Sequence, residues 1–227
     1  KELLGFYVTG HPLSPYAPIL EKYVIANSVQ MAALPARGMT RTAGMIAGIQ
    51  QGFSKKSNKP YAMITLEDLE GSFQILAMNE NYDKYREHFV VNKALMIIGE
   101  VNNGEDRPKV FPTEIMPLED APRKFTKQVH FRLNTAHLDP EKIQQAFDLA
   151  QAHPGRCPLF LCMKYPAGQM VFIEAHERYR VMPSLELERA VNSLFGEDTY
   201  YAKVDTTVPE RVKPRWEKKS QDNGGDE

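Results

Sequence analysis

The feature that most constrains the fold is the order of apolar patterns between residues 37 and 118. Five runs in this region alternate apolar and polar residues with the period of a β-strand: 41–54, 61–69, 73–79, 95–101 and 110–116. Between the third and fourth runs, Tyr82, Tyr85 and Phe89 recur at spacings of three and four, as on one face of an amphipathic helix. The region therefore reads as three strands, one helix and two strands.

This order predicts a five-stranded barrel of the oligonucleotide/oligosaccharide-binding (OB) type, over residues 37–118. Such barrels bind single strands over strands two and three, between the loops that join strands one to two and four to five. The first of these loops carries three lysines and is flanked by two aromatic residues. The predicted nucleic-acid-binding residues are Lys55, Lys56, Lys59, Phe53 and Tyr61.

The charge balance leaves a second interpretation of the barrel open. Residues 37–118 contain ten Lys+Arg and ten Asp+Glu, so the region is neutral. The second framing loop carries Glu105 and Asp106 with only Arg107. The lysines could then belong to a solvated hairpin loop, in a barrel that serves only as a protein-interaction scaffold.

Residues 128–206 repeat a strand–helix–strand pattern twice, and the predicted fold class of the chain is mixed α+β. Asp139 is placed to cap the first helix with Pro140 at its first position, and Ser184 to cap the second, which Gly196 ends. A single strand is expected from residue 170 to 181. The two units predict a small split β-α-β domain with its helices on one face of the sheet.

Three further segments complete the predicted organisation. Residues 1–36 form a helical lead-in whose apolar faces are too small for a core of their own, so they are expected to pack on another part of the protein. Residues 119–127 are expected to be a charged linker, and residues 207–227 a disordered tail.

Composition and motifs argue against catalysis, metal binding and membrane insertion. The 227 residues carry 28 Lys+Arg against 29 Asp+Glu, and no apolar run approaches the ~18 residues of a membrane span. Two cysteines in such a chain favour a reducing, cytoplasmic setting. Cys157 and Cys162, expected on one strand, would point to opposite faces, and neighbouring carboxylates such as Glu67 and Asp68 are interpreted as solubility charges. We therefore predict no catalytic residue, no metal ligand and no cofactor in this chain.

Several stretches resemble one protein family. The opening, KELLGFYVTGHPL at residues 1–13, is similar to the segment that leads into the OB domain of bacterial replicative DNA polymerase III alpha subunits. The similarity continues through KKSNKPYAMITLEDLEGS at residues 55–72 and YDKY at residues 82–85. It implies the C-terminal part of a DNA-directed DNA polymerase, a nucleotidyltransferase in DNA replication. The catalytic aspartates and their magnesium would lie outside this chain.

The resemblance also implies partners. It implies that the OB domain handles single-stranded template, bound weakly, and that the last domain docks the tau subunit of the clamp loader. The sliding clamp would bind regions mostly outside this chain. From the residues themselves, the expected partner-binding side chains are Phe172, Arg178 and Arg180 on the exposed face of the last sheet, and Trp216 in the tail.

A tRNA-binding OB module of a synthetase is a further alternative. It would share the barrel but should continue into a nucleotide-binding catalytic domain. Residues 128–206 contain no such motif.

Overall fold

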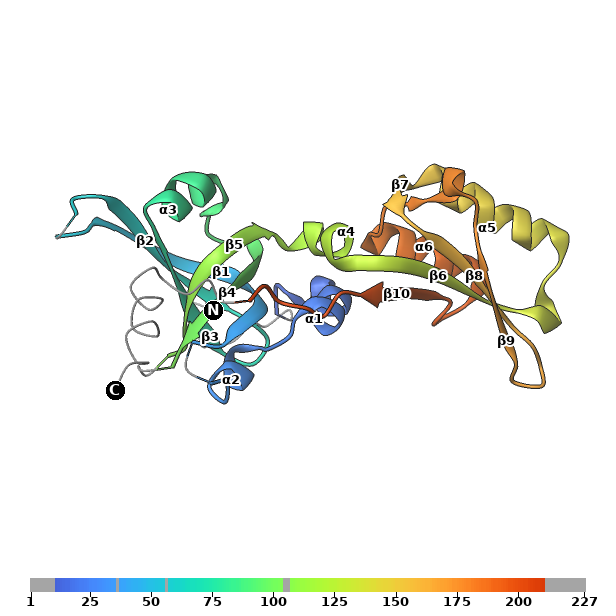
Figure 1. Ribbon diagram of the computed structural model, residues 1–227, viewed down its shortest axis with the longest axis horizontal. Coiled ribbons are helices and arrows are strands. Elements are labelled where there is room, and N and C mark those ends of the chain that lie inside the picture. Colours follow the sequence, from blue (N-terminus) through green and yellow to red (C-terminus); the bar gives the residue numbers. More distant parts are fainter. Residues whose placement is uncertain (1–10, 36, 56, 104–106, 211–227) are drawn as a thin grey trace, which may run out of the picture. The chain divides into compact units, whose positions relative to one another are not determined.

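A computed structural model describes residues 11–35, 37–55, 57–103 and 107–210. The chain divides into two compact units, shown in Figure 1. The barrel unit holds most of residues 26–115, and the C-terminal unit holds residues 11–25 and 116–206. Each unit has its own core and is described separately.

The barrel unit is a closed barrel of five strands in the order β1-β2-β3-β5-β4. Its strands are β1 (Met39–Phe53), β2 (Pro60–Glu67), β3 (Ser72–Met78), β4 (Ala94–Asn102) and β5 (Lys109–Pro117). β1, β2 and β3 form an antiparallel meander, and β3 pairs with β5 in parallel. The order of elements matches the one expected from the alternating apolar runs.

Two local features let these strands close into a barrel. The β1–β2 register shifts between Ile46 and Gly48, a bulge that bends the long first strand. At the bend Ile46 exchanges backbone hydrogen bonds with Lys93 and Asn92, just before β4. On β4, a Cβ at Gly99 would lie 2.4 Å from the carbonyl oxygen of Phe111, so only glycine allows this close approach of β4 and β5.

The core of the barrel unit consists of the inward residues of each strand. β2 and β3 bury every second residue: Ala62, Ile64, Leu66, Phe73, Ile75 and Ala77. The intervening residues stay partly exposed on the outside. The predicted helix between strands three and four is α3 (Glu80–Tyr85) followed by a 3₁₀ helix (Arg86–His88), with Tyr85 and Phe89 buried.

A buried carboxylate ties the short helix α2 (Ser28–Met31) to the β2–β3 turn. Asp68 Oδ1 accepts hydrogen bonds from the Ser28 hydroxyl at 2.8 Å and from the amides of Glu70 at 2.9 Å and Gly71 at 2.7 Å. Asp68 Oδ2 accepts from the Ser28 amide at 2.6 Å. The interpretation of Asp68 as a solubility charge was therefore wrong, because four donors surround a side chain that is buried.

The C-terminal unit contains a four-stranded sheet in the order β10-β6-β8-β9. These strands are β6 (Thr126–Asn134), β8 (Leu159–Lys164), β9 (Met170–Glu174) and β10 (Tyr200–Val204), with the short β7 (Pro154–Cys157) beside them. β6 and β8 are parallel and directly adjacent, whereas β8–β9 and β10–β6 are antiparallel. The first strand–helix–strand unit is thus not split, because no strand lies between β6 and β8.

Two helices pack on one face of this sheet (Figure 1). They are α5 (Pro140–Ala152) and α6 (Leu185–Phe195). Their N-terminal caps are those expected: Asp139 accepts from the Lys142 amide at 2.8 Å, and Ser184 accepts from the Leu187 amide at 3.1 Å. Gly196 ends α6 with a φ of 102°, which side chains rarely adopt. Ala146, Ala150, Leu187 and Val191 bury the helices against β6, β8 and β10.

The strand expected over residues 170–181 is shorter than predicted. β9 ends at Glu174, and Glu177–Tyr179 forms a 3₁₀ helix. Tyr179 instead packs on Phe147 of α5, with ring centroids 4.4 Å apart. Val181 bridges to Pro154 and Cys157. Arg178 and Arg180 therefore do not share a strand face with Phe172.

The segment at residues 11–25 packs on the C-terminal unit. It contains α1 (Ala17–Tyr23), whose Tyr23 hydroxyl lies 2.7 Å from that of Thr126, and whose Lys22 forms a salt bridge with Glu188 of α6. Residues 119–127 are more ordered than a linker. α4 (Ala121–Phe125) follows a 3₁₀ helix (Leu118–Asp120) and buries Ala121 and Phe125. Residues 1–10 and 211–227 lie outside the described residues.

We find no helix in the described part of the chain that is long and apolar enough to cross a membrane.

The Asp68 carboxylate provides a test of the barrel unit. Both oxygens of Asp68 accept hydrogen bonds. In an Asp68→Asn variant, the side-chain NH₂ group would replace one of these acceptors and point at N–H or O–H donors. We therefore expect a loss of about 2 kcal/mol or more of local stability. Hydrogen exchange of the Glu70 and Gly71 amides should accelerate accordingly. Asp83→Asn, at an exposed position of α3, should leave this exchange unchanged. Equal protection in both variants would contradict the role assigned to Asp68.

Candidate nucleic-acid interface

The β1–β2 hairpin extends from the barrel and carries the sequence-predicted site (Figure 1). Phe53 of β1 pairs with Pro60 of β2. The connecting turn closes through backbone hydrogen bonds from Ser54 to Lys59 at 2.9 Å and from Asn58 to Ser54 at 2.7 Å. Asn58 has a φ of 50°, a left-handed conformation that asparagine tolerates in turns. The turn thus holds Lys55 and Lys59, both exposed, at the tip of the hairpin.

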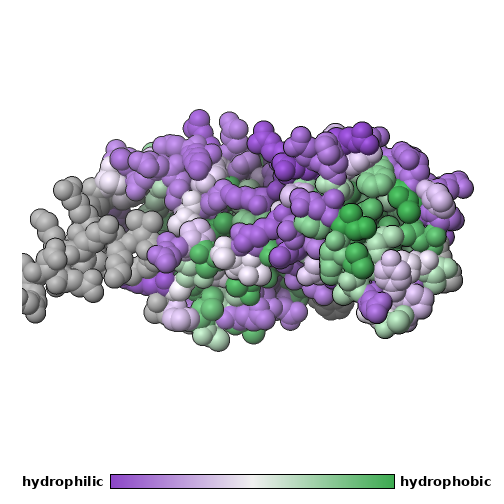
Figure 2. All heavy atoms as spheres, turned by 45° about the vertical axis from the view of Figure 1, so that its right-hand side comes forward, coloured by the Kyte–Doolittle hydropathy of each residue, from purple (hydrophilic) through white to green (hydrophobic). Residues whose placement is uncertain are grey.

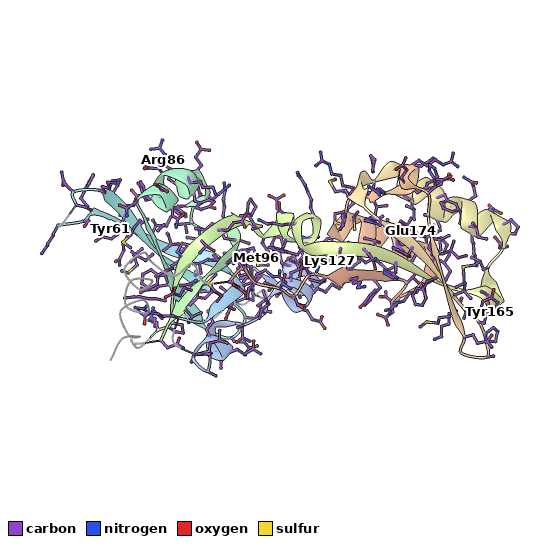
Figure 3. The ribbon with its side chains drawn as sticks, viewed as in Figure 1. Tyr61, Arg86, Met96, Lys127, Tyr165 and Glu174 are labelled. Atoms are coloured by element: carbon purple, nitrogen blue, oxygen red, sulfur yellow. The ribbon has the colours of Figure 1, made fainter. Side chains whose placement is uncertain are left out.

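Tyr61 lies on the outer face of the barrel (Figure 3). Its cross-strand partner is Gly52, and a Cβ at Gly52 would lie 2.9 Å from the Tyr61 hydroxyl oxygen. The ring therefore packs across the bare backbone of β1. A larger residue at position 52 would displace it.

Three cross-strand rows without acidic residues lie on this side of the barrel, and the next pair along it is Glu67 with Ser72. The paired residues are Gly52, Tyr61 and Met78 in the first row, Gln50, Met63 and Leu76 in the second, and Gly48, Thr65, Gln74 and Lys109 in the third. The β2 and β3 members are partly exposed, and none of them is charged. We call these three rows the outer face. Uncharged, partly apolar side chains suit base stacking, while cations belong at the margins.

Phe53 does not lie on the outer face. Side chains alternate along a strand, and Phe53 pairs with Pro60, one residue before Tyr61. It is 69% exposed, on the opposite face of the hairpin. The structure therefore does not bring Phe53 and Tyr61 together as one stacking platform, although each remains accessible.

Cations lie at both margins of the outer face. Lys55 and Lys59 occupy the hairpin tip, and Lys109 is aligned with Gln74 on the β5 side. Arg107, just before β5, is exposed. Lys56 lies outside the described residues, as do Glu105 and Asp106. Of the outer-face residues, only Tyr61 was among the predicted site residues, although period-two alternation around Tyr61 already separates Met63 and Thr65 from the buried positions.

The predicted partner-binding residues are dispersed in the C-terminal unit. Phe172 lies on β9 and is 54% exposed. Arg178 lies in the following 3₁₀ helix, where its guanidinium donates to the Tyr179 hydroxyl at 2.6 Å and covers that ring. Arg180 is exposed beyond it. Trp216 lies outside the described residues.

β9 itself is an apolar edge strand. It pairs with β8 along one side and ends the sheet on the other. Its side chains Met170, Val171, Phe172 and Ile173 are all about half exposed, on both faces of the strand. Figure 2 shows hydrophobic side chains gathered on the C-terminal unit. Glu174 is the charged residue of β9 and lies at its end, and four consecutive exposed apolar residues before it are unusual at a sheet edge that faces water.

A comparison with protein-family models agrees with the barrel geometry. A family model described as an OB-fold nucleic acid binding domain matches residues 40–118. Among solved structures, an OBody bound to hen egg-white lysozyme covers 42% of this chain and 91% of its own, with a TM-score of 0.35 and 15% identity. A replication factor A related protein from Methanobacterium thermoautotrophicum covers 38% of this chain and 86% of its own, with a TM-score of 0.33 and 16% identity. The closed five-stranded barrel is of the OB type.

Curated relatives extend over both units. The DNA polymerase III subunit alpha of Pseudomonas fluorescens is 26% identical over 205 residues, which is 88% of this chain and 17% of that subunit. The Escherichia coli K12 subunit is 23% identical over 209 residues, or 90% of this chain and 18% of that subunit. The chain thus spans less than a fifth of the relatives' length. Its resemblance to DNA polymerase III alpha subunits is confirmed.

The described residues bring together no group of three His, Cys, Asp or Glu side chains able to hold a metal ion. Cys157 and Cys162 lie on different strands, β7 and β8, rather than on one. Cys157 is buried in the core beneath the helices, whereas Cys162 contacts Met170 on the other face, with sulfur atoms 3.8 Å apart. Burial raises the pKa of the Cys157 thiol to about 11.

The raised pKa makes Cys157 a test of the C-terminal core. At pH 8 the folded thiol should be alkylated by iodoacetamide about 100-fold more slowly than the same thiol in urea-unfolded chain, because only the thiolate reacts. The folded rate should rise with pH up to about 11 and then level off. Peptide mass spectrometry gives both rates. Equal rates at pH 8 would show that Cys157 is not buried as described.

Proposed function

We propose that this chain is a non-catalytic part of a bacterial replicative DNA polymerase alpha subunit, which guides single-stranded template over its barrel and docks the clamp-loader tau subunit through its last unit. The observation that carries the proposal is the outer face, whose β2 and β3 side chains are uncharged and which has the exposed lysines Lys55 and Lys59 at one margin. The relatives supply the replication context, since they are DNA polymerase III alpha subunits.

The polymerase activity of the whole protein is part of this proposal, because the chain spans only 17% of a relative such as the Pseudomonas fluorescens subunit. Template-directed synthesis, with its aspartates and magnesium, is assigned to regions outside this chain. So is the main contact with the sliding clamp. The role assigned to this chain is to hold the single-stranded template and to position the tau subunit.

Binding to a single strand would be weak and tolerant of sequence. Every base has a π-face, and Tyr61 with its neighbours Met63 and Leu76 offers stacking without a hydrogen-bonding pattern that selects a base. Lys55 and Lys59 can neutralise about two phosphates, which gives a log–log salt slope of roughly −1.4 for a single strand.

The lysines and Tyr61 provide the test. Titration of the chain with fluorescent oligo(dT) should show a salt slope that falls in magnitude by about 1.4 in a Lys55→Ala/Lys59→Ala variant. Tyr61→Ala should weaken binding by about 1–3 kcal/mol, whereas Tyr61→Phe should retain it. A Lys84→Ala/Lys93→Ala variant removes two exposed cations away from the hairpin and should match the unmodified chain.

If the hairpin variant and its control bind alike, the barrel does not use this face. That result would favour the scaffold alternative, in which the barrel contacts only proteins. Preference for tRNA over oligo(dT) would favour the tRNA-binding alternative instead.

The apolar edge of β9 supports the partner-docking part of the proposal. Val171 and Ile173 lie on one side of the strand and Phe172 on the other, so an added segment could cover both sides at once. The free edge also presents backbone donors and acceptors that an extended partner segment can pair with. Removing this apolar surface from water would stabilise the complex by about 25 cal/mol for each Å² that is buried.

Ile173→Glu should therefore reduce binding of purified tau by at least about tenfold, measured by surface plasmon resonance with the full chain. The matched control is Val90→Glu in the barrel unit, since Val90 is 47% exposed and Ile173 is 49% exposed. Both variants should fold, because both positions already face water. Loss of tau binding in the control alone would place the docking site on the barrel.

A further inference from the structure

The sheet of the C-terminal unit has a second face, opposite the helices, that the barrel site does not use and that the β9 edge shares only at its own strand. Its residues follow from the strand registers. One row across the sheet contains Tyr201, His130, Phe160 and Glu174, and the next contains Arg132, Cys162 and Phe172. Gln128 and Lys203 form a row on one side of these, and Asn134, Lys164 and Met170 a row on the other. We call this surface the open sheet face.

Aromatic rings from all four strands gather around His130 on the open sheet face. His130 stacks on Phe160, with ring centroids 5.1 Å apart and planes 17° apart. Phe172 and Tyr201 meet the same imidazole edge-on, at 5.9 Å and 5.6 Å. The two outer rings remain open to solvent, since Tyr201 is 41% exposed and Phe172 is 54% exposed. The cluster is a continuous aromatic surface fixed by its own ring contacts.

Cations accompany these rings. The Arg132 guanidinium lies over the Tyr201 ring, 3.9 Å from its centroid, and so adds a second planar group to the surface. Lys203 and Lys164 are exposed in the flanking rows, whereas Glu174 is the acidic residue in these four rows and lies at the β9 margin. Burial, together with the charges of Arg132 and Lys203, lowers the pKa of His130.

We propose that the open sheet face binds single-stranded nucleic acid, with bases stacked on Tyr201, Phe160 and Phe172 and phosphates held by Arg132, Lys203 and Lys164. Aromatic rings and arginine planes on an open sheet are the groups on which proteins stack unpaired bases. In this arrangement, the nucleic-acid strand lies mainly over β10, β6 and β8, away from Glu174.

The charge and shape of the face select this occupant. A protein helix docks best into a groove of aliphatic side chains, whereas this surface offers rings with cations around them and a net charge of plus two over Arg132, Lys203, Lys164 and Glu174. Such a pattern complements a flexible polyanion with planar bases. The site is additional to the barrel.

Photocrosslinking separates this site from the barrel. The full chain is mixed with oligo(dT) in which thymines are replaced by 5-iodouracil, irradiated, digested and analysed by mass spectrometry. We expect crosslinked peptides that contain Tyr201, Phe160 or Phe172, in addition to any that contain Tyr61 or Phe53. Crosslinks confined to residues 37–118, or none at all, would overturn the proposal whatever the barrel does.

Matched variants then test the contacts. Tyr201→Ala should abolish crosslinking at β10 and lower oligo(dT) affinity about fivefold or more, in a chain that also carries Tyr61→Ala. Its control is Tyr165→Ala, because Tyr165 is equally exposed, at 42%, in the β8–β9 connection (Figure 3). Lys203→Ala should reduce the magnitude of the salt slope by about 0.7, whereas Arg189→Ala, on α6, should not change it.

The alternative outcome is that the open sheet face binds a protein partner instead of nucleic acid. If Tyr201→Ala and Phe172→Ala weaken tau binding and leave oligo(dT) affinity and crosslinking unchanged, the open sheet face belongs to the partner interface. Equal effects of Tyr201→Ala and Tyr165→Ala on oligo(dT) would likewise reject the proposed site.

Discussion

The Asp68 carboxylate fixes the geometry on which the barrel site depends. It accepts four hydrogen bonds within the β2–β3 turn and from α2, which sets the register of β2 against β3. A shift of one residue would turn Tyr61, Met63 and Thr65 into the core and expose Ala62, Ile64 and Leu66. The four neutral donors compensate the buried carboxylate. A contact at the far end of β2 thus determines which side chains of the strand point outward and form the outer face.

The sequence was informative wherever a local rule decides the structure. Alternation located the barrel strands, and the caps at Asp139 and Ser184 located both C-terminal helices, because a capping side chain bonds within its own turn. Long-range contacts were not predictable. The end of β9 depends on Tyr179 reaching Phe147, far away in the chain, and the burial of Asp68 depends on Ser28. The opposite faces of Phe53 and Tyr61 follow from a pairing register that the sequence does not display.

The two units solve the same physical problem in related ways. A sheet must bury one face, and the barrel does so by closing on itself, whereas the C-terminal sheet uses α5 and α6. In each unit one face of the sheet remains exposed to water. On each exposed face an aromatic ring packs against a neighbouring residue. In the barrel the neighbour is the bare backbone of Gly52 beneath Tyr61. In the C-terminal sheet it is Arg132 over Tyr201.

The edges of the C-terminal sheet differ in a way that separates their roles. β10 buries Tyr200 and Ala202 beneath the helices and places Lys203 toward solvent, so this edge gains little from a further strand. β9 lacks that cover, and its four apolar side chains are half exposed on both sides. Exposing them costs stability unless a partner covers the strand, whereas the rings around His130 already contact one another. An apolar edge therefore favours a protein strand, and a basic aromatic face favours stacked bases.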